Sequence, residues 1–424
     1  MPYDVARVRA TYPALAEGFA HLDGAAGTQV AAPVIAAVAG TLGRAVSNRS
    51  AAFEPGRRST EIVTAAREAV ADLVGGVPGG VVFGPSATAL TYVVARTLAQ
   101  SWQPGDEVVV SRLDHDANVR PWVQAAEGAG ATVRWAEFDP ESGDLPAKQY
   151  ADLVGPRTRV VAVTAASNVT GAMPRVREIA DLAHAAGALV YVDGVHATAH
   201  VPTDVRELGA DFYVTSAYKW SGPHLAAVVA DPAVWEALRP EKLIPSSDAV
   251  PERFEFGTPS FELLAGVIAA VEHLAALPEL SGSGPAGPGG DGAARPGDNG
   301  GGTAGVGAGR RARVVAGMTV AAAHETELLD RLLAGLAANP DVTVLPAPSA
   351  RCPTVSFRLR GRSPAETART LGDQGVCVFS GDYYAYEYFA AAGLRDSGGA
   401  VRASIYHYNT VEEVDRLLTA LRTV

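Results

Sequence analysis

The sequence predicts an α/β protein whose larger part is a mainly parallel sheet covered by helices on both faces, followed by a smaller α+β domain. Between residues 81 and 230, short apolar segments alternate with helical segments, as they do in βαβ units. Most of the apolar segments are nearly continuous, which is typical of strands buried on both faces. With 424 residues, the chain is also long enough for more than one domain.

The first predicted elements are a helix and a strand–turn–helix junction. Residues 58–75 carry apolar side chains at helical spacing. The apolar run 81–83 comes next and leads through GPSAT, at 84–88, into a second helical stretch, 87–101. A turn of this kind places the start of a helix directly beyond the end of a strand.

The following elements continue the alternation. Strands are predicted at 107–112, 132–138, 158–167, 188–194, 211–217 and 225–230. Helices are predicted at 119–130, 176–187 and 260–277, and a glycine ends each of the first two.

A segment rich in glycine and proline, 281–309, interrupts this pattern. It holds almost no apolar bulk, so we predict a flexible insertion. Beyond it, predicted helices alternate with predicted strands, at 310–338, 354–359, 363–374, 376–381, 400–406 and 410–423. We therefore divide the chain into an N-terminal segment that packs with the small domain, a large domain, the insertion and the small domain, with bounds 1–20, 21–280, 281–309 and 310–424.

Charge and composition exclude several classes of protein. The chain has 35 basic and 46 acidic residues, a formal net charge of −11, which argues against non-specific nucleic-acid binding. Two cysteines, Cys352 and Cys377, are too few for a disulfide framework or a cysteine-rich zinc site. No apolar run reaches the roughly 18–20 residues of a membrane span, and the first residues lack the apolar core of a secretory signal. We therefore expect a cytoplasmic protein with no membrane partner.

Lysine is rare in this chain, which has only Lys148, Lys219 and Lys242. Lys219 follows one predicted strand, and Asp193 ends the predicted strand before it. Because ligands of α/β sheets bind beyond the carboxyl ends of strands, both side chains are expected near one site. Pyridoxal phosphate needs a lysine that bonds to its aldehyde and a carboxylate that keeps its ring nitrogen protonated. The spacing alone also fits a surface lysine and an aspartate that caps a loop.

Three other stretches suit the same cofactor. The amides of GPSAT, with the hydroxyls of Ser86 and Thr88, suit a phosphate at a helix N-terminus, and the stretch lacks the fingerprint of a nicotinamide dehydrogenase. His115 follows a predicted strand and suits stacking on a flat ring or proton transfer. Asn168 follows another and suits a hydrogen bond to a ring hydroxyl. Taken singly, these residues also fit a helix cap, a loop histidine and a turn asparagine.

In their order along the chain, these motifs resemble the class V aminotransferase family of fold-type I pyridoxal-phosphate enzymes, and most closely its cysteine desulfurase-like branch. The resemblance covers almost the whole chain apart from the insertion. It rests on HLDGAAGTQV (21–30), GDEVVVSRLDHDANVRPW (105–122), SNVTG (167–171), VDGVH (192–196), SAYKW (216–220), RFEFGTPSF (253–261) and VRASIYHYNT (401–410).

The resemblance implies a fold-type I large domain that binds pyridoxal 5′-phosphate as a Schiff base with Lys219. It makes Lys219, His115 and Asp193 the catalytic residues, with His115 stacked on the cofactor ring and Asp193 on its nitrogen. Arg402 would bind the substrate carboxylate. The other implied cofactor contacts are Ser86, Ala87, Thr88, Asn168, His196, Ser216, Tyr218, Gly257 and Thr258.

The resemblance also implies a homodimer. Gly257 and Thr258 lie far along the chain from the other phosphate residues, and in the family this segment reaches the cofactor phosphate of the partner subunit. We therefore expect a two-fold symmetric dimer with its sites at the interface.

The sequence departs from the family at three places. Tyr218 stands where the family usually has histidine, and His196 where it often has glutamine. The stretch 379–388 lacks the mobile-loop cysteine of the desulfurases, and Tyr384 occupies its place. Because a phenol is not a sulfur acceptor, we expect no strict desulfurase. We expect Cys377, in an apolar strand pattern, to be buried in the core.

The predicted function is that of a pyridoxal-phosphate enzyme acting on an amino acid or related amine. Transamination, β-elimination and racemisation share an intermediate, so the motif residues do not choose among them. A C–S lyase or a true cysteine desulfurase remains an alternative within the family. A catalytically silent scaffold, from another class, would have lost Lys219, Asp193 or the phosphate residues, and the sequence keeps them all.

Overall fold

The computed structural model describes residues 3–283 and 306–423. Most of the predicted insertion, 281–309, thus lies outside the described residues. The helix predicted at 310–338 begins earlier, at Val306, and ends at Ala337.

The centre of the molecule is a seven-stranded sheet with strand order β2-β8-β7-β6-β5-β3-β4. Strand β8 runs antiparallel to both of its neighbours, whereas the others pair in parallel, so the predicted mainly parallel sheet is confirmed. The strands are β2 (Val81–Gly84), β3 (Glu107–Ser111), β4 (Thr132–Ala136), β5 (Thr158–Thr164), β6 (Leu189–Asp193), β7 (Phe212–Ser216) and β8 (Ala226–Ala230).

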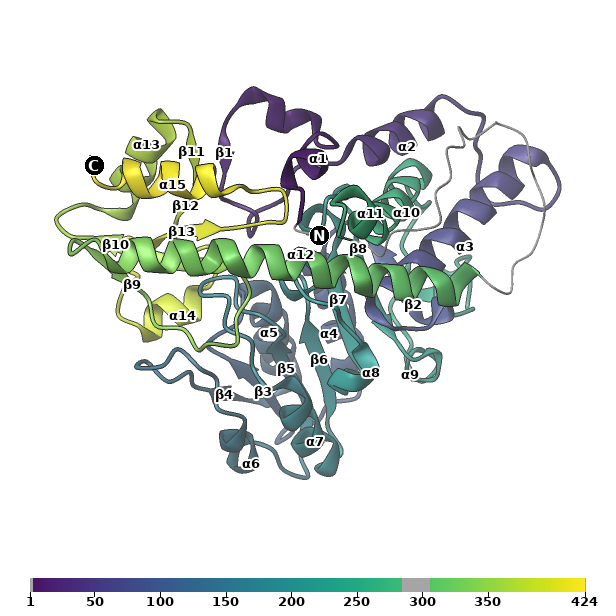
Figure 1. Ribbon diagram of the computed structural model, residues 1–424. Helices are drawn as coiled ribbons and strands as arrows, with labels where there is room; N and C mark the ends of the chain where they lie inside the picture. Colours follow the sequence, from purple (N-terminus) through teal and green to yellow (C-terminus); the bar gives the residue numbers. More distant parts are fainter. Residues whose placement is uncertain (1–2, 284–305, 424) are drawn as a thin grey trace.

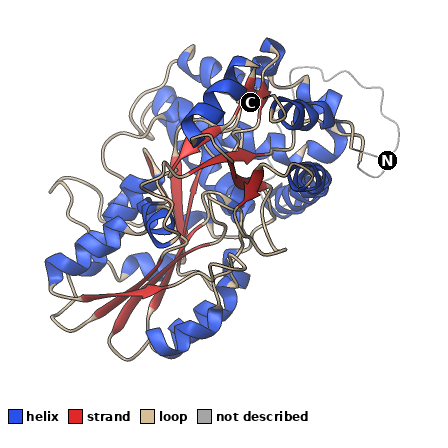
Figure 2. Cartoon of the chain, turned by 90° about the vertical axis from the view of Figure 1, so that its left-hand side faces the viewer, coloured by secondary structure: helices blue, strands red, loops and turns tan. Residues whose placement is uncertain are grey.

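Two separate apolar cores cover the two faces of this sheet. Successive residues of β6 alternate between them, with Val190 and Val192 in one core and Tyr191 in the other. Helices α4 (Ala87–Ala99) and α5 (Arg120–Ala129) cover one face, and Figure 2 shows the sheet between its helical layers. Because both faces are buried, the central strands are largely apolar, which explains the nearly continuous runs in the sequence.

The remaining helices complete the two layers and the periphery. They are α1 (Val5–Arg9), α2 (Ala32–Leu42), α3 (Glu54–Val74), α6 (Tyr150–Leu153), α7 (Val176–Ala185), α8 (Val205–Leu208), α9 (Pro232–Glu236), α10 (Phe261–Ala275), α11 (Leu277–Leu280), α12 (Val306–Ala337), α13 (Pro364–Asp373), α14 (Tyr386–Ala391) and α15 (Val411–Ala420).

The C-terminal part forms a four-stranded antiparallel sheet with order β12-β13-β10-β9. A third core, which includes leucines of α12 and α15, packs against it. The long helix α12 spans the molecule in Figure 1, from α3 beside the large sheet to the small sheet. The small-sheet strands are β9 (Val342–Val344), β10 (Thr354–Leu359), β12 (Phe379–Gly381) and β13 (Ala400–Ser404).

The strand predicted at 376–381 is divided in two. Its first part, β11 (Val376–Cys377), pairs in parallel with β1 (Ala20–His21) near the N-terminus. Its second part is β12 of the small sheet. A continuous apolar pattern does not show which strand each half of the segment pairs with. In this structure the first half pairs with the N-terminal segment.

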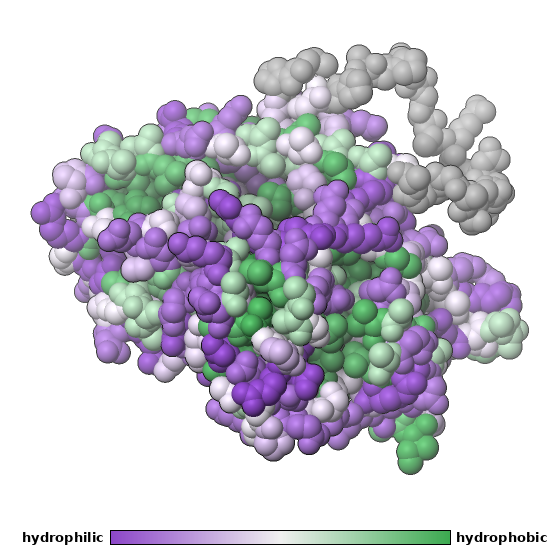
Figure 3. Space-filling model, turned by 90° about the horizontal axis from the view of Figure 1, so that it is seen from below, coloured by the Kyte–Doolittle hydropathy of each residue, from purple (hydrophilic) through white to green (hydrophobic). Residues whose placement is uncertain are grey.

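No helix among the described residues is long and apolar enough to cross a lipid bilayer. Figure 3 shows hydrophilic residues over much of the face seen from below, with apolar patches between them.

Candidate active site

A cavity of about 610 Å³ lies at the carboxyl ends of the large-sheet strands, beside the small sheet. It brings together all of the predicted site residues except Gly257 and Thr258. The predicted residues that line it are Ser86, Ala87, Thr88, His115, Asn168, Asp193, His196, Ser216, Tyr218, Lys219 and Arg402.

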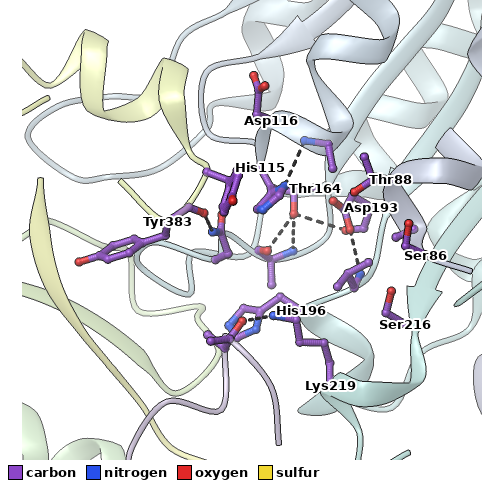
Figure 4. A pocket seen from close by; sticks show the side chains of 18 of the residues that line it. Ser86, Thr88, His115, Asp116, Thr164, Asp193, His196, Ser216, Lys219 and Tyr383 are labelled. Carbon is purple, nitrogen blue, oxygen red and sulfur yellow. Dashed lines mark hydrogen bonds between the residues drawn. The ribbon is translucent and has the colours of Figure 1, made fainter. Parts of the chain in front are cut away.

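One end of the cavity is built for an anion. Ser86 caps α4, and its Oγ accepts a hydrogen bond from the Ala89 N–H at 3.1 Å. The amides of Ala87 and Thr88 belong to the first turn, where N–H groups have no partner within a helix. Figure 4 shows Ser86, Thr88 and Ser216 on one side of the cavity. These donors and the positive end of the helix dipole fit a phosphate group.

Asp193 supplies a buried carboxylate at the end of β6. Its Oδ1 accepts a hydrogen bond from the Val195 N–H at 2.9 Å. The next residue, Gly194, has no room for a side chain because a Cβ would collide with the ring of Tyr213. Burial raises the pKa of Asp193 to about 6, and Lys219 opposes this effect. A buried carboxylate of this kind fits a protonated ring nitrogen, because the positive charge of the ring would stabilise the ionised carboxylate.

Lys219 lies in the short turn after β7 and is 9% exposed. Its Nζ donates a hydrogen bond to the carbonyl of Ala25, in the N-terminal segment. Burial first, and then the charge of Arg402, lower its pKa to about 7, while Asp23 and Asp193 act in the opposite direction. The amine is therefore substantially neutral at neutral pH, as bonding to an aldehyde requires.

Arg402 reaches the cavity from β13 of the small sheet and is buried. It donates to the Asn168 carbonyl at 3.0 Å and to Asp23 Oδ1 at 3.3 Å. Its Nε has no partner among the described residues. The guanidinium lies 4.7 Å from the centre of the Tyr383 ring. Its free donor fits an incoming carboxylate.

His115 follows β3 on the side of the cavity opposite Lys219 in Figure 4. Its Nδ1 accepts a hydrogen bond from the Ala117 N–H at 3.0 Å, so the neutral ring carries its proton on Nε2. Burial, with a smaller effect from Lys219, lowers the pKa of His115 to about 3. A neutral ring in this position fits stacking against a flat cofactor.

Three other predicted residues have partners that sequence reasoning did not find. The Asn168 amide donates to the Tyr383 carbonyl at 2.9 Å, while its buried Oδ1 has no hydrogen-bond partner in the described part of the chain. His196 Nε2 lies 3.0 Å from Thr354 Oγ1. Tyr218 stacks on the exposed ring of His224, with ring centres 4.9 Å apart.

Gly257 and Thr258 are exposed and lie outside this cavity in the single chain. The expectation that Cys377 is buried in the core is wrong. Cys377 is only half-buried, because Val376 is the residue of β11 that faces the third core and Cys377 alternates to the other side of the strand; Cys352 is the fully buried cysteine. No cysteine is among the described residues that line the cavity.

Several cavity residues carried no recognised signal in the sequence. They come from the N-terminal segment, from α4 and α5, from the end of β5 and the loops after β3, β5 and β6, and from β12 and the loop after it, where Tyr383 and Tyr384 lie. The sequence predicts Tyr384 in the place of the desulfurase cysteine, whereas it assigns no role to Asp116, Arg120, Phe379 or Tyr92. These additional residues are Ala25, Ala26, Tyr92, Asp116, Ala117, Arg120, Pro121, Thr164, Ala166, Val195, Phe379, Tyr383 and Tyr384.

The fold and the donor set together define a pyridoxal-phosphate enzyme of fold type I. The comparisons with known proteins agree. A model of the aminotransferase class-V family matches residues 20–279 and 302–417. The chain belongs to the aminotransferase class V family.

Several individual relatives are named as cysteine desulfurases. An uncharacterized protein of Mycobacterium tuberculosis is 36% identical over the full length of both chains. A probable cysteine desulfurase of Pseudomonas aeruginosa is 33% identical over 97% of this chain and 96% of its own. The crystal structure of the cysteine desulfurase CsdA of Escherichia coli matches 100% of this chain and 98% of its own, with a TM-score of 0.82 and 26% identity.

Proposed function

We propose that this enzyme breaks the Cα–H bond of an α-amino acid, with Lys219 as the base, and forms no persulfide on its own chain. One observation carries the proposal: Lys219, with its pKa lowered to about 7, shares a cavity with Asp193 and Arg402. No thiol is among the described residues that line that cavity.

Pyridoxal phosphate, when bound, supplies a ring that accepts the electron pair left when a bond to Cα breaks. Asp193 would hold the proton on the ring nitrogen. The first turn of α4, with Ser86 and Thr88, would bind the phosphate together with Ser216. His115 would stack on the ring and exclude water.

The substrate is oriented by its carboxylate. Arg402 offers its unpartnered Nε, and its other donors are fixed by Asp23 and the carbonyl of Asn168. Holding the carboxylate leaves the Cα–H bond facing Lys219, whose neutral amine takes the proton. Transamination, β-elimination and racemisation all begin with this proton transfer.

A scan of amino acids tests the proposal. The holoenzyme is mixed with each amino acid while its visible spectrum, pyruvate, ammonia and sulfide are followed together. We expect a spectral change with at least one amino acid, and none with Lys219→Ala. Lys242→Ala, a lysine outside the cavity, is the matched control and should behave as wild type. Wild-type turnover by Lys219→Ala would refute the role of this lysine.

A cysteine desulfurase is the second candidate, because several relatives carry that name and Cys377 is half-buried only two residues before the cavity-lining Phe379. Burial raises the pKa of Cys377, which makes it a poor thiolate. Incubation with cysteine, alkylation without reductant and mass analysis test this candidate. We expect no added sulfur atom. A persulfide on Cys377, with loss of activity in Cys377→Ala, would restore the desulfurase function.

We further propose a homodimer in which Gly257 and Thr258 complete the partner's phosphate site. Their exposure outside the cavity supports it, as does the neighbouring Phe256, which is also exposed. Sedimentation at micromolar concentration should show a dimer, and a monomer that still holds pyridoxal phosphate would contradict it. Both cysteines are free thiols, which suits the reducing cytoplasm.

A further inference from the structure

We propose that the substrate is an α-amino acid with an aromatic or large apolar side chain, which packs against Tyr384 and Phe379 at the mouth of the cavity. The inference rests on the proposed function, since it takes the amino acid to be bound by Arg402. It goes beyond that function by assigning the class of side chain.

Two aromatic rings line the cavity without being buried by the fold. Tyr384 is 73% exposed and Phe379 is 42% exposed, and both line the same cavity. Large apolar groups left exposed together in a concave site are typical of a ligand-binding surface. An apolar group of a ligand that covers these rings removes their exposed surface from water, which favours binding.

The positions of these rings match the proposed orientation of the substrate. The Tyr384 ring stacks on His115, with centres 5.7 Å apart and planes 27° apart. The Phe379 ring centre lies 5.7 Å from the guanidinium carbon of Arg402. An amino acid bound through its carboxylate at Arg402, beside a cofactor ring on His115, therefore has an aromatic ring near each of these two contacts.

The charged residues described along the cavity already have partners or a role in the proposed chemistry, so none of them is left to pair with a charged substrate side chain. Lys219, Asp193 and Arg402 are used by the proposed chemistry. The other charged residues on its described lining are Arg120 and Asp116, which pair at 2.9 Å. A distal carboxylate or ammonium group would have to break this pair or lose its water without compensation.

The segment that carries Tyr384 is held in place. The Tyr384 carbonyl accepts a hydrogen bond from the Asp116 N–H at 2.7 Å. Glu387, three residues later, accepts from Arg112 at 2.7 Å and from Arg120 at 2.8 Å. Tyr384 also has a φ of 58°, a left-handed conformation that is unfavourable for a tyrosine. These contacts hold the backbone of Tyr384 in an otherwise unfavourable conformation. The Tyr384 ring is therefore a preformed part of the cavity wall.

Calorimetric binding of carboxylates without an amino group tests the inference. The holoenzyme is titrated with 3-phenylpropanoate, propanoate and succinate, which can occupy a carboxylate site but cannot react as amino acids. We expect 3-phenylpropanoate to bind at least about tenfold more tightly than propanoate, because its ring leaves water. Succinate should show no such gain.

Variants of Tyr384 identify the ring responsible. Tyr384→Ala should reduce the preference for 3-phenylpropanoate by about two- to tenfold, while Tyr384→Phe should keep it. Phe19→Ala is the matched control: this ring is 42% exposed, like that of Phe379, but does not line the cavity, so its loss should leave the preference unchanged.

Three results would overturn the inference: equal binding of the first two carboxylates, tighter binding of succinate, or an effect of Tyr384→Ala on sedimentation alone. The last result would show that a second copy of the chain covers the ring. Failure of the proposed function is a different outcome, in which no amino acid changes the cofactor spectrum although the carboxylates still bind.

Discussion

The amine of Lys219 should combine with pyridoxal phosphate at neutral pH, whereas the two other lysines of the chain should not. Burial and the charge of Arg402 lower its pKa from 10.5 to about 7. At pH 7 about half of this amine is then neutral, against roughly 0.03% of a lysine with the ordinary pKa. The reactive fraction is therefore larger by about a thousandfold.

The assay mixes apoprotein with pyridoxal phosphate between about pH 5 and pH 10, reduces the adduct with borohydride and maps the modified lysine by mass spectrometry. Modification of Lys219 should rise with pH through a midpoint near 7, since protonation below that pH removes the nucleophile. Lys148 is exposed and Lys242 lies outside the cavity, so they serve as internal controls. Near neutral pH they should be modified far less than Lys219.

Arg402→Gln should move the midpoint for Lys219 upward. The substitution removes the positive charge that lowers the pKa and leaves Asp23 free to raise it. A wild-type midpoint near 10, or equal modification of all three lysines, would refute the argument from burial. An unchanged midpoint in Arg402→Gln would refute the contribution of Arg402 alone.

Three other predictions follow from buried or capping groups. Between pH 7 and 10.5, Lys219 is protonated in the unfolded chain but not in the folded protein, so the free energy of unfolding should rise with pH. In urea unfolding, Lys219→Met apoprotein should be more stable than wild type at pH 7 by up to about 4 kcal/mol, and this difference should disappear toward pH 10.5. A difference that does not change with pH would contradict this. Glu387→Gln should cost about 1–2 kcal/mol and increase hydrogen exchange over residues 382–388, because it weakens two charged hydrogen bonds; unchanged exchange would count against a held segment. Thr410→Ala should cost about 1 kcal/mol in the same unfolding assay, because it removes the capping box with Glu413, whereas Thr410→Ser should keep most of it.

Local patterns in the sequence were sufficient for most of the large domain. The apolar runs predicted β5 and β6 because both faces of these strands are buried, and the alternation with helices predicted a mainly parallel sheet. Asp193 ends β6, and Lys219 follows directly after β7. Both could therefore be placed at the same edge of the sheet, because parallel strands bring their carboxyl ends together. The capping box of α15 is likewise a local signal.

Other features depend on partners that are distant in the sequence. The apolar stretch 376–381 reads as one strand, but β11 pairs with the N-terminal strand β1 while β12 joins the small sheet. Within β11, Val376 faces the third core and Cys377 alternates to the other side, where it is only half-buried. Nothing local to the stretch records which segments are available for pairing, so sequence reasoning placed Cys377 in the core.

The fold class, the family and the reactive side chains of the site could be derived from the amino-acid sequence alone. The environment of those side chains depends on how the chain folds. Arg402 comes from the small sheet, Asp23 from the N-terminal segment and Lys219 from the large sheet, and their proximity is what lowers the pKa of the lysine. Desolvation and Coulombic interaction depend on distance in space and not on separation along the chain, so no sequence motif contains them.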